Sequence, residues 1–149
     1  MPIRLLLVAL ALCPLFLSGC GKSKTRLNPT TGQVFVNGVP AHQATVVFFP
    51  VTEEGEAQAL AVAYPAAVVG PDGTFELTTF KKGDGAVAGD YIVAVVWCET
   101  TKVDGDVLES GDKLEGKYAT RFCSPLRATI NKGKNTLPKF ELEFSETPR

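Results

Sequence analysis

The chain has few of the side chains on which most enzyme sites are built. Its 149 residues include a single histidine, His42, a single tryptophan, Trp97, and four cysteines. A catalytic triad needs a base such as histidine beside a nucleophile, and a zinc site usually needs several cysteine or histidine ligands. His42 lies in a predicted surface turn, with no serine or cysteine close to it in the sequence. We therefore expect a protein that is not an enzyme and that holds no metal or other cofactor.

The charged residues also lack the patterns that bind ions. Asp104-Gly105-Asp106 is the nearest approach to a calcium loop, but the spaced third ligand and the bidentate glutamate of an EF-hand are missing. Gly83 and Gly85 precede a predicted strand, so they offer no helix N-terminus to a phosphate. The net charge of −1 gives no reason to expect nucleic acid or an anionic membrane surface as a partner.

Long helical periods are absent, and alternating or β-branched runs take their place. The spacing predicts seven strands, at residues 32–38, 44–50, 59–69, 74–78, 90–98, 126–130 and 136–144. Pro65 bends or divides the third strand, which we place at a sheet edge because proline cannot donate to a ladder. One helical turn is expected around residues 112–118. Seven short strands without a long helix predict an all-β sandwich.

The N-terminus does contain one long apolar run, residues 5–16, which follows Arg4. A basic start, an apolar middle and small residues before a cut site are typical of a secretory signal. The run is too short for a transmembrane helix, which needs about 20 apolar residues. A membrane span and a plain secretory signal remain the alternatives to the interpretation that follows.

Residues 17–20, Leu-Ser-Gly-Cys, resemble the lipobox of bacterial lipoproteins. The resemblance implies that the signal is removed before Cys20 and that Cys20 carries lipid. We accordingly expect an extracytoplasmic protein anchored to the membrane, and Gly21 in place of an aspartate favours the outer membrane over the inner one. The predicted organisation is a signal peptide at 1–19, the lipidated cysteine and a flexible tether at 20–30, and a β-sandwich domain at 31–149.

Two cysteines remain in the domain. Cys98 and Cys123 form an even pair in an oxidising compartment, which favours a disulfide. The alternative is two buried free thiols that pack as small apolar side chains.

Aromatic side chains in loops are the best candidates for contact with a ligand. Tyr64 and Tyr118 lie in loop-like stretches, and an exposed ring can stack on a sugar. Trp97 instead shares the alternation of Tyr91 and Val93, so we expect it in the core.

The order of the turn and core residues resembles that of carboxypeptidase-regulatory-like domains. The matching motifs are Gly32-x-Val34-x-Val36-Asn37-Gly38, Ala44-x-Val46-x-Phe48-x-Pro50, Asp72-Gly73-x-Phe75-x-Leu77 and Gly89-Asp90-Tyr91-x-Val93-x-Val95. Together with the lipobox and the tail around Lys117-Tyr118-Ala119, they look like a group of small lipoproteins abundant in planctomycete-type bacteria. The resemblance implies a transthyretin-like, immunoglobulin-like sandwich without catalytic residues.

These observations predict a lipid-anchored domain of the cell envelope with a structural or protein-binding role. The alternative is a carbohydrate- or peptide-binding module that serves an envelope enzyme or transporter. Alternation also turns Phe35, Phe49 and Ile92 away from the core. If their strands share one sheet, we expect an apolar patch covered by residues 99–121 through Leu108 and Leu114. A partner protein or a tolerated scatter of apolar residues would be the alternatives.

Overall fold

The computed structural model describes residues 26–51, 63–98 and 100–145. These residues form strands and turns without a helix. The strands are β1 (Leu27–Asn28), β2 (Thr30–Val36), β3 (Val39–Pro40), β4 (Thr45–Pro50), β5 (Ala66–Val68), β6 (Thr74–Glu76), β7 (Ala86–Val87), β8 (Gly89–Val96), β9 (Thr100–Val103), β10 (Asp106–Glu109), β11 (Arg127–Ile130), β12 (Asn135–Thr136) and β13 (Phe140–Leu142). The signal peptide, Cys20 and most of the predicted tether lie outside the described residues.

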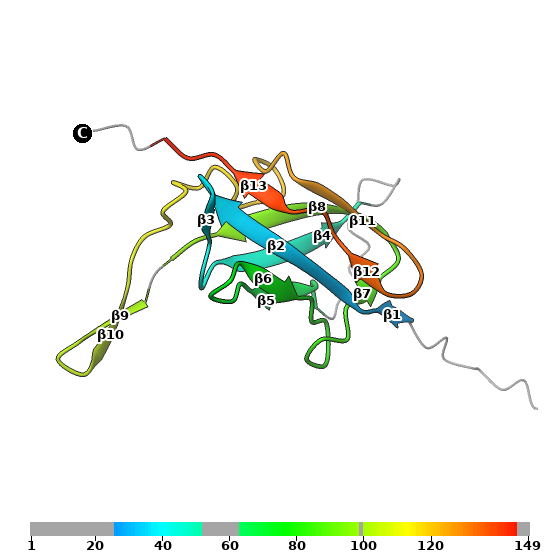
Figure 1. Cartoon of the computed structure of the whole chain (residues 1–149), viewed down its shortest axis with the longest axis horizontal. Helices are drawn as coiled ribbons and strands as arrows, with labels where there is room; N and C mark the ends of the chain where they lie inside the picture. The colour runs from blue at the N-terminus through cyan, green and yellow to red at the C-terminus, as the bar shows by residue number, and fades with distance from the viewer. Residues whose placement is uncertain (1–25, 52–62, 99, 146–149) are drawn as a thin grey trace, which may run out of the picture.

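Two sheets face each other and enclose the core (Figure 1). The first sheet has the order β11-β8-β4-β5, and all its pairs are antiparallel. The second is built on β2, which pairs antiparallel with β3 and β6 and parallel with β12 and β13. The predicted all-β sandwich is confirmed. The structure divides it into more and shorter strands than the seven expected from the sequence.

Side chains alternate between the core and the surface along the central strands, as the period of two predicts. The inward residues are all buried, namely Val34, Val36, Val46, Phe48, Tyr91, Val93 and Val95. Phe48 occupies the middle of this set, with ring centroids 6.2 Å from Phe75 and 5.9 Å from Tyr91. Burial of one such ring stabilises the fold by about 1.5–3 kcal/mol, so the aromatic cluster is a major part of the core.

The domain begins earlier than the expected boundary at residue 31. Leu27 and Asn28 form β1, which pairs with β7, and β2 starts at Thr30. The Asn28 side chain is 2% exposed and donates from Nδ2 to the Ala86 carbonyl at 3.1 Å. Its Oδ1 accepts from the Gly133 N–H at 2.8 Å. A buried amide with partners on two other segments fixes this stretch to the sandwich, so residues 27–30 are not part of a free tether.

The segment from residue 99 to 121 does not form the expected cover. Its described first part is the hairpin β9–β10, which projects from the sandwich and has only exposed residues, Leu108 included (Figure 1). Its last part turns back, and Leu114 is completely buried in the core. The expected helical turn at 112–118 is a series of tight turns, because Glu115 and Gly116 have positive φ angles of 50° and 77°.

The expected apolar patch is divided between the two sheets. Phe35 lies on β2 in the second sheet, whereas Phe49 and Ile92 pair with each other in the first. The Phe49 ring packs on Tyr64 at 4.8 Å, and the ammonium of Lys139 lies 4.8 Å from the centre of the Phe35 ring. All three side chains are therefore partly buried by local neighbours, without a common cover.

Candidate functional site

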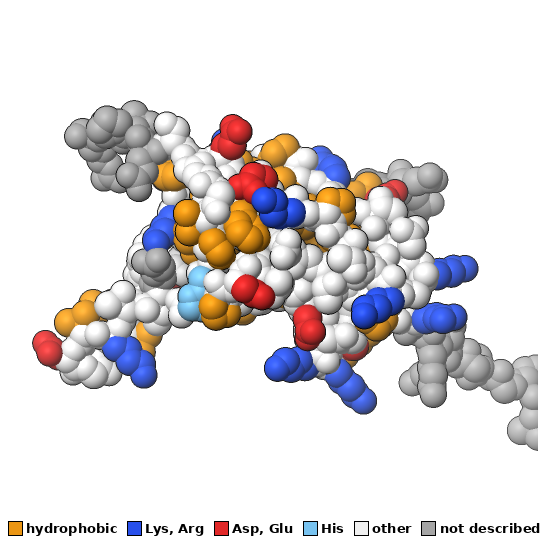
Figure 2. Space-filling model, in the orientation of Figure 1, with side chains coloured by type: hydrophobic (Ala, Val, Ile, Leu, Met, Phe, Trp, Pro, Cys, Tyr) orange, Lys and Arg blue, Asp and Glu red, His pale blue; other side chains and the backbone are white. Residues whose placement is uncertain are grey.

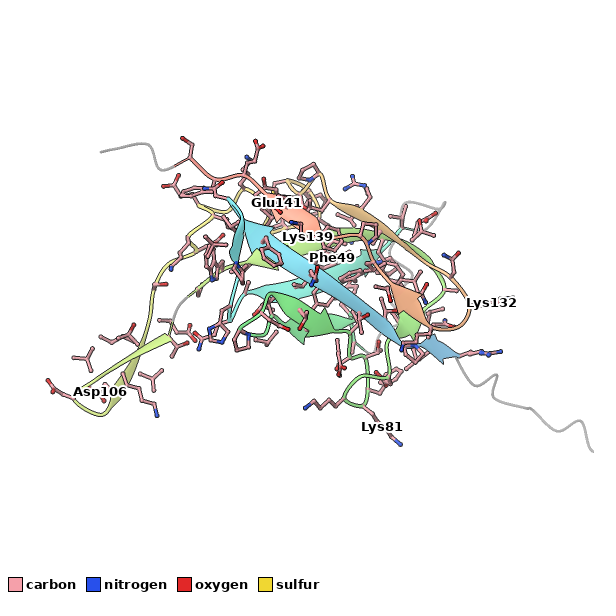
Figure 3. The ribbon with its side chains drawn as sticks, viewed as in Figure 1. Phe49, Lys81, Asp106, Lys132, Lys139 and Glu141 are labelled. Carbon is pink, nitrogen blue, oxygen red and sulfur yellow. The ribbon has the colours of Figure 1, made fainter. Side chains whose placement is uncertain are left out.

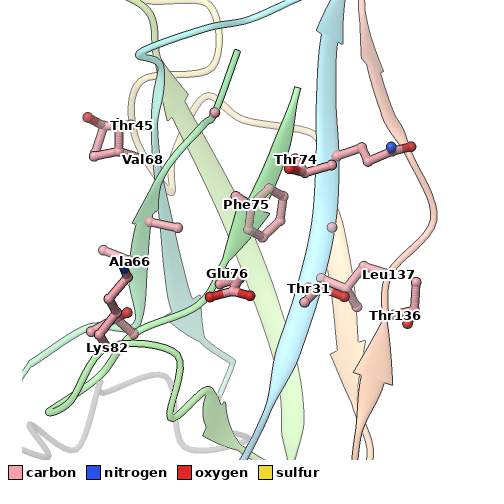
Figure 4. A pocket seen from close by; sticks show the side chains of 15 residues that line it. Thr31, Thr45, Ala66, Val68, Thr74, Phe75, Glu76, Lys82, Thr136 and Leu137 are labelled. Carbon is pink, nitrogen blue, oxygen red and sulfur yellow. The ribbon is translucent and has the colours of Figure 1, made fainter. Parts of the chain in front are cut away.

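A groove runs along the line where β5 of the first sheet meets β6 of the second (Figure 4). It has a volume of about 980 Å³. The lining residues are Thr31, Gly32, Gln33, Thr45, Ala66, Ala67, Val68, Gly70, Thr74, Phe75, Glu76, Thr78, Lys82, Thr136 and Leu137. Hydroxyl groups predominate among the polar side chains, and Glu76 and Lys82 add one charge of each sign.

On the β5 side of the groove, the backbone N–H and C=O groups of alternate residues point in opposite directions. Phe48 N–H donates to the Pro65 carbonyl and Val69 N–H to the Ala44 carbonyl, so the odd residues of this segment bond to β4. Even residues point the other way. Ala66 accordingly bonds across the groove to Thr78, in both directions at 2.9 Å, and closes one end of it.

The β6 side has the complementary pattern. Leu77 N–H donates to Thr30 and Val34 N–H donates to Gly73, so odd residues here bond to β2 and even residues face the groove. At the other end of the groove, Gly70 N–H donates to the Thr74 carbonyl at 2.7 Å.

Val68 and Glu76 stand opposite each other, midway between these two closed ends. If the antiparallel register of the pairs Ala66–Thr78 and Gly70–Thr74 continued between them, it would pair Val68 with Glu76. No ladder joins them. Among the described strands, β5 pairs only with β4 and β6 only with β2, and the bridge between Ala66 and Thr78 is isolated. The two sheets diverge at this position and leave two short strand edges facing each other. A groove with main-chain donors and acceptors on both sides can take an extended chain or a polar ligand.

The Phe75 ring forms the floor of the groove. It is almost completely buried, stacks on Phe140 with the ring centroids 6.5 Å apart, and belongs to the lining. Val68, by contrast, is 66% exposed at the rim. The site therefore has a buried aromatic base and an exposed apolar side chain at its rim.

The two tyrosines that the sequence suggested as ligand contacts have different positions. Tyr64 is 44% exposed and packs on Phe49, so its ring remains accessible. Tyr118 is 5% exposed, belongs to the core and donates from its hydroxyl to the Glu143 carbonyl at 3.2 Å. The prediction for Tyr118 is wrong, because the chain folds back after Leu114 and turns this ring inward. Neither tyrosine lines the groove.

Trp97 and His42 form a second, smaller cleft of about 400 Å³ at the base of the projecting hairpin. The Trp97 ring, which was expected in the core, is only partly buried against it, and its Nε1–H donates to the His42 carbonyl at 2.9 Å. The ammonium of Lys113 lies 4.7 Å from the centre of the ring and occupies one of its faces. The His42 side chain is exposed, in agreement with the predicted surface turn.

The expected disulfide is not present, because Cys98 and Cys123 are both free cysteines. The Cys123 thiol lies in its own turn, 3.1 Å from the Thr120 hydroxyl and 3.3 Å from the Gly116 carbonyl. The hydrogen bonds from the Thr120 hydroxyl and N–H lower the pKa of this exposed thiol. The described contacts of the Cys123 sulfur are thus with residues of its own turn, Gly116 and Thr120.

Within the part of the chain that the structure describes, no three His, Cys, Asp or Glu side chains gather into a possible metal site. The described residues also contain no helix that is long and apolar enough to cross a bilayer.

The chain matches no protein-family model and no curated protein sequence. Among solved structures it is similar to a 9R-lipoxygenase from Cyanothece PCC8801, at 14% identity and a TM-score of 0.43 over 78% of this chain. The chain spans 16% of the length of that lipoxygenase. A provisionally assigned carbohydrate-binding protein from Pseudomonas aeruginosa is similar at 11% identity and a TM-score of 0.38, over 80% of this chain and 90% of the other. TM-scores this low make neither likeness a basis for assigning fold or function.

Sequence reasoning missed the groove, although its strands were predicted. The third predicted strand was placed at a sheet edge, which β5 confirms. Nothing in the local pattern indicates that β5 and β6 belong to different sheets, and their divergence is what opens the site.

Proposed function

We propose that this chain is a lipid-anchored, non-catalytic domain of the cell envelope that binds an extended segment of a partner protein. The groove between β5 and β6 is the single observation that favours binding. Native proteins normally pair or cover their strand edges, because exposed edges attract other chains. Here two edges face each other over a groove and remain available at Val68 and Glu76.

A bound segment would enter the groove between the two closed ends, with its main-chain groups directed at those of Val68 and Glu76. Recognition by strand edges takes its affinity from backbone hydrogen bonds and its specificity from the surrounding side chains. Gln33, Thr45 and Thr74 would supply that specificity. The small alanine side chains of β5 leave room for a backbone to approach.

Site-specific photo-crosslinking in intact cells tests this function. A crosslinking residue at Val68 should capture one defined protein. The crosslinked peptide of that protein should have few charged residues and a sequence that favours an extended conformation. A crosslinker at Val107, which is similarly exposed on the projecting hairpin, is the matched control. Capture of the same proteins from both positions would show that the groove has no specific partner.

Carbohydrate binding is the second candidate, and the hydroxyl-rich lining of the groove favours it. Gln33, Glu76 and Lys82 would hydrogen-bond a sugar. The groove lacks an exposed ring for stacking, and Lys113 covers one face of Trp97 in the smaller cleft, which is why we rank this candidate second. A glycan array decides between the two: binding that is lost in Gln33→Ala and retained in Gln43→Ala would favour the sugar.

The anchoring part of the proposal rests on residues 1–25, outside the described part of the chain. Cys20→Ser should leave the protein uncut or soluble. Several acyl chains anchor a protein stably, whereas one chain binds a membrane only marginally. If the Cys20→Ser protein still enters the detergent phase as the parent does, lipidation at Cys20 is excluded. The resemblance to carboxypeptidase-regulatory-like domains is part of the same proposal, supported by the motifs named above.

A further inference from the structure

Three segments that are distant in sequence meet at the end of the sandwich where β1 lies. Asn28 joins them, since it bonds to Ala86 after the 79–85 loop and to Gly133 in the 131–135 turn. The Asn135 N–H also donates to the Pro29 carbonyl at 2.8 Å. The side chains that flank these contacts therefore share one end of the molecule.

That end has a cluster of cations, which we call the basic pole. It consists of Arg26, Lys81, Lys82, Lys132 and Lys134, all of them exposed. Figure 3 labels Lys81 and Lys132 at this end, and Asp106 at the tip of the projecting hairpin at the opposite end. Figure 2 shows the same gathering of Lys and Arg side chains around the end at which β1 lies.

Three described carboxylates lie near the basic pole. Asp84 accepts hydrogen bonds from three backbone N–H groups of its own loop, and Asp90 binds the Thr129 hydroxyl at 2.5 Å. Glu76 lines the groove. Five cations therefore outnumber three anions here, although the net charge of the whole chain is −1. This count covers the described residues, and it leaves out Glu53, Glu54 and Glu56, which lie outside them.

The chain itself determines which end of the domain faces the anchor. Arg26 follows Cys20 by six residues, and an extended chain of that length reaches about 20 Å. A lipid on Cys20 would thus hold the basic pole within that distance of the bilayer surface.

We propose that the basic pole docks on anionic phospholipid headgroups and fixes the orientation of the domain on the membrane. This inference rests on the proposed lipid anchor for its geometry. Clusters of four to eight Lys and Arg residues next to a membrane anchor bind anionic lipid, and the attraction decays over about 8 Å at physiological ionic strength. The basic pole begins at Arg26, so it is the described part of the domain next to the anchor along the chain.

The orientation has a consequence for recognition. With the basic pole on the membrane, the β9–β10 hairpin at the other end points away from the bilayer (Figure 1). The Trp97 cleft does so too, because Thr100 and Thr101 of β9 belong to its lining. The groove between β5 and β6 adjoins the basic pole through Lys82, which belongs to both.

Vesicle binding tests the docking without lipidation of the protein. The probe is a set of large vesicles of phosphatidylcholine with one third phosphatidylglycerol, compared with vesicles of phosphatidylcholine alone. The protein is residues 20–149 with Cys20→Ser, which retains every strand of the fold. We expect co-sedimentation with the anionic vesicles at low salt, little with the neutral ones, and loss of binding at high salt.

Charge reversals locate the binding surface. R26E/K81E alters two of the three segments of the pole, and K132E/K134E alters the third. Both variants avoid the groove, and each should weaken binding by about tenfold or more. K102E/R121E changes the net charge equally, on the hairpin and in the segment beside Val95, and should bind like the parent. Circular dichroism and thermal unfolding confirm that each variant is folded, and two independent pole variants guard against a local defect in one of them.

Three results would overturn the proposal. The first is equal binding to neutral and anionic vesicles, and the second is no binding to either. The third is a K102E/R121E variant that loses as much affinity as the pole variants, since net charge rather than the pole would then be responsible. None of these results affects the Cys20→Ser test of lipidation, so the failure of docking and the failure of anchoring are distinguished.

Discussion

Gly32 and Phe75 stand opposite each other in the β2–β6 ladder, and the ring of Phe75 fills the space that a side chain on Gly32 would need. A Cβ at Gly32 would lie 2.5 Å from Cζ of Phe75. The same ring is the floor of the groove and contacts Phe48 and Phe140. Glycine at this position therefore allows the aromatic cluster to close the sandwich beneath the candidate site.

Gly32→Val should destabilise the domain, because the ring of Phe75 cannot move without displacing its own core neighbours. Overpacking of this kind costs about 1–3 kcal/mol in the free energy of unfolding. Urea denaturation measures the change. Gly111→Ala is the control: Gly111 is exposed and has no heavy atom within 4 Å of its Cβ position. Equal stability of Gly32→Val and the parent would show that Phe75 is not fixed in place.

Asn28→Ala should also destabilise the fold. It leaves the Ala86 carbonyl and the Gly133 N–H without their buried partner, which costs about 2 kcal/mol. The two hydrogen bonds of the Asn28 side chain join three segments of the chain, so we expect faster amide exchange at residues 86 and 133 in the variant. Asn131→Ala, an exposed position in the same turn, should stay within about 0.5 kcal/mol of the parent. A similar loss in both variants would contradict the role assigned to Asn28.

The stability of the domain should fall in acid through Asp84. Partial burial raises the pKa of this carboxyl, but the N–H groups of Thr79, Lys81 and Phe80 outweigh that effect and hold the pKa below the ordinary 3.8. A depressed native pKa means that the ionised group stabilises the fold at pH values above its unfolded pKa. That contribution is lost as the pH falls through the native pKa.

Urea midpoints between neutral pH and strong acid measure this effect. Asp84→Asn should be less stable than the parent at neutral pH, and the difference should disappear at the acid end. Asp106→Asn, on the exposed hairpin, should follow the parent at every pH. A constant difference between Asp84→Asn and the parent across the range would show that charge is not the cause.

Cys123 should react faster with alkylating reagents than Cys98. Its thiol is exposed, and the Thr120 hydroxyl lowers its pKa, which raises the thiolate fraction near neutral pH. Thr120→Val should slow the reaction at Cys123 and leave Cys98 unchanged. Mass spectrometry of the non-reduced protein follows both sites. A protein that takes up no reagent until it is reduced would contain the Cys98–Cys123 disulfide after all.

Several features could be predicted because they depend on residues close in sequence. Alternation along β2, β4 and β8 determined which side chains face the core, since successive strand residues point to opposite faces. The turn at Asn37-Gly38 formed as predicted, with φ angles of 49° and 78° that favour these two residues. The same logic would have found the β9–β10 hairpin, because Asp104-Gly105 is an equally strong hairpin turn. We considered these residues only as an approach to a calcium loop.

Other features depend on contacts between distant segments, and local patterns contain no information about them. Tyr118 lies in a polar stretch, yet it enters the core because Val95 N–H bonds to its carbonyl and draws the segment against β8. Phe35 alternates like Phe49, yet β2 pairs with β6 and β13 rather than with β4. Which strands pair is decided by the packing of the whole chain, so the predicted patch could not be tested before the sheets were known.

The sequence by itself determined the all-β character of this protein and its inward residues, because both follow from a period of two that any local stretch displays. It also contains the lipobox-like residues 17–20, on which the proposed anchoring depends. Only the tertiary structure decided where the two sheets diverge, and therefore that Val68 and Glu76 face each other across a groove. It likewise decided that Arg26, Lys81 and Lys132 share one end of the molecule. The net charge can be counted from the sequence. Where the charges lie on the molecule depends on contacts between distant segments, which here are held together by the side chain of Asn28.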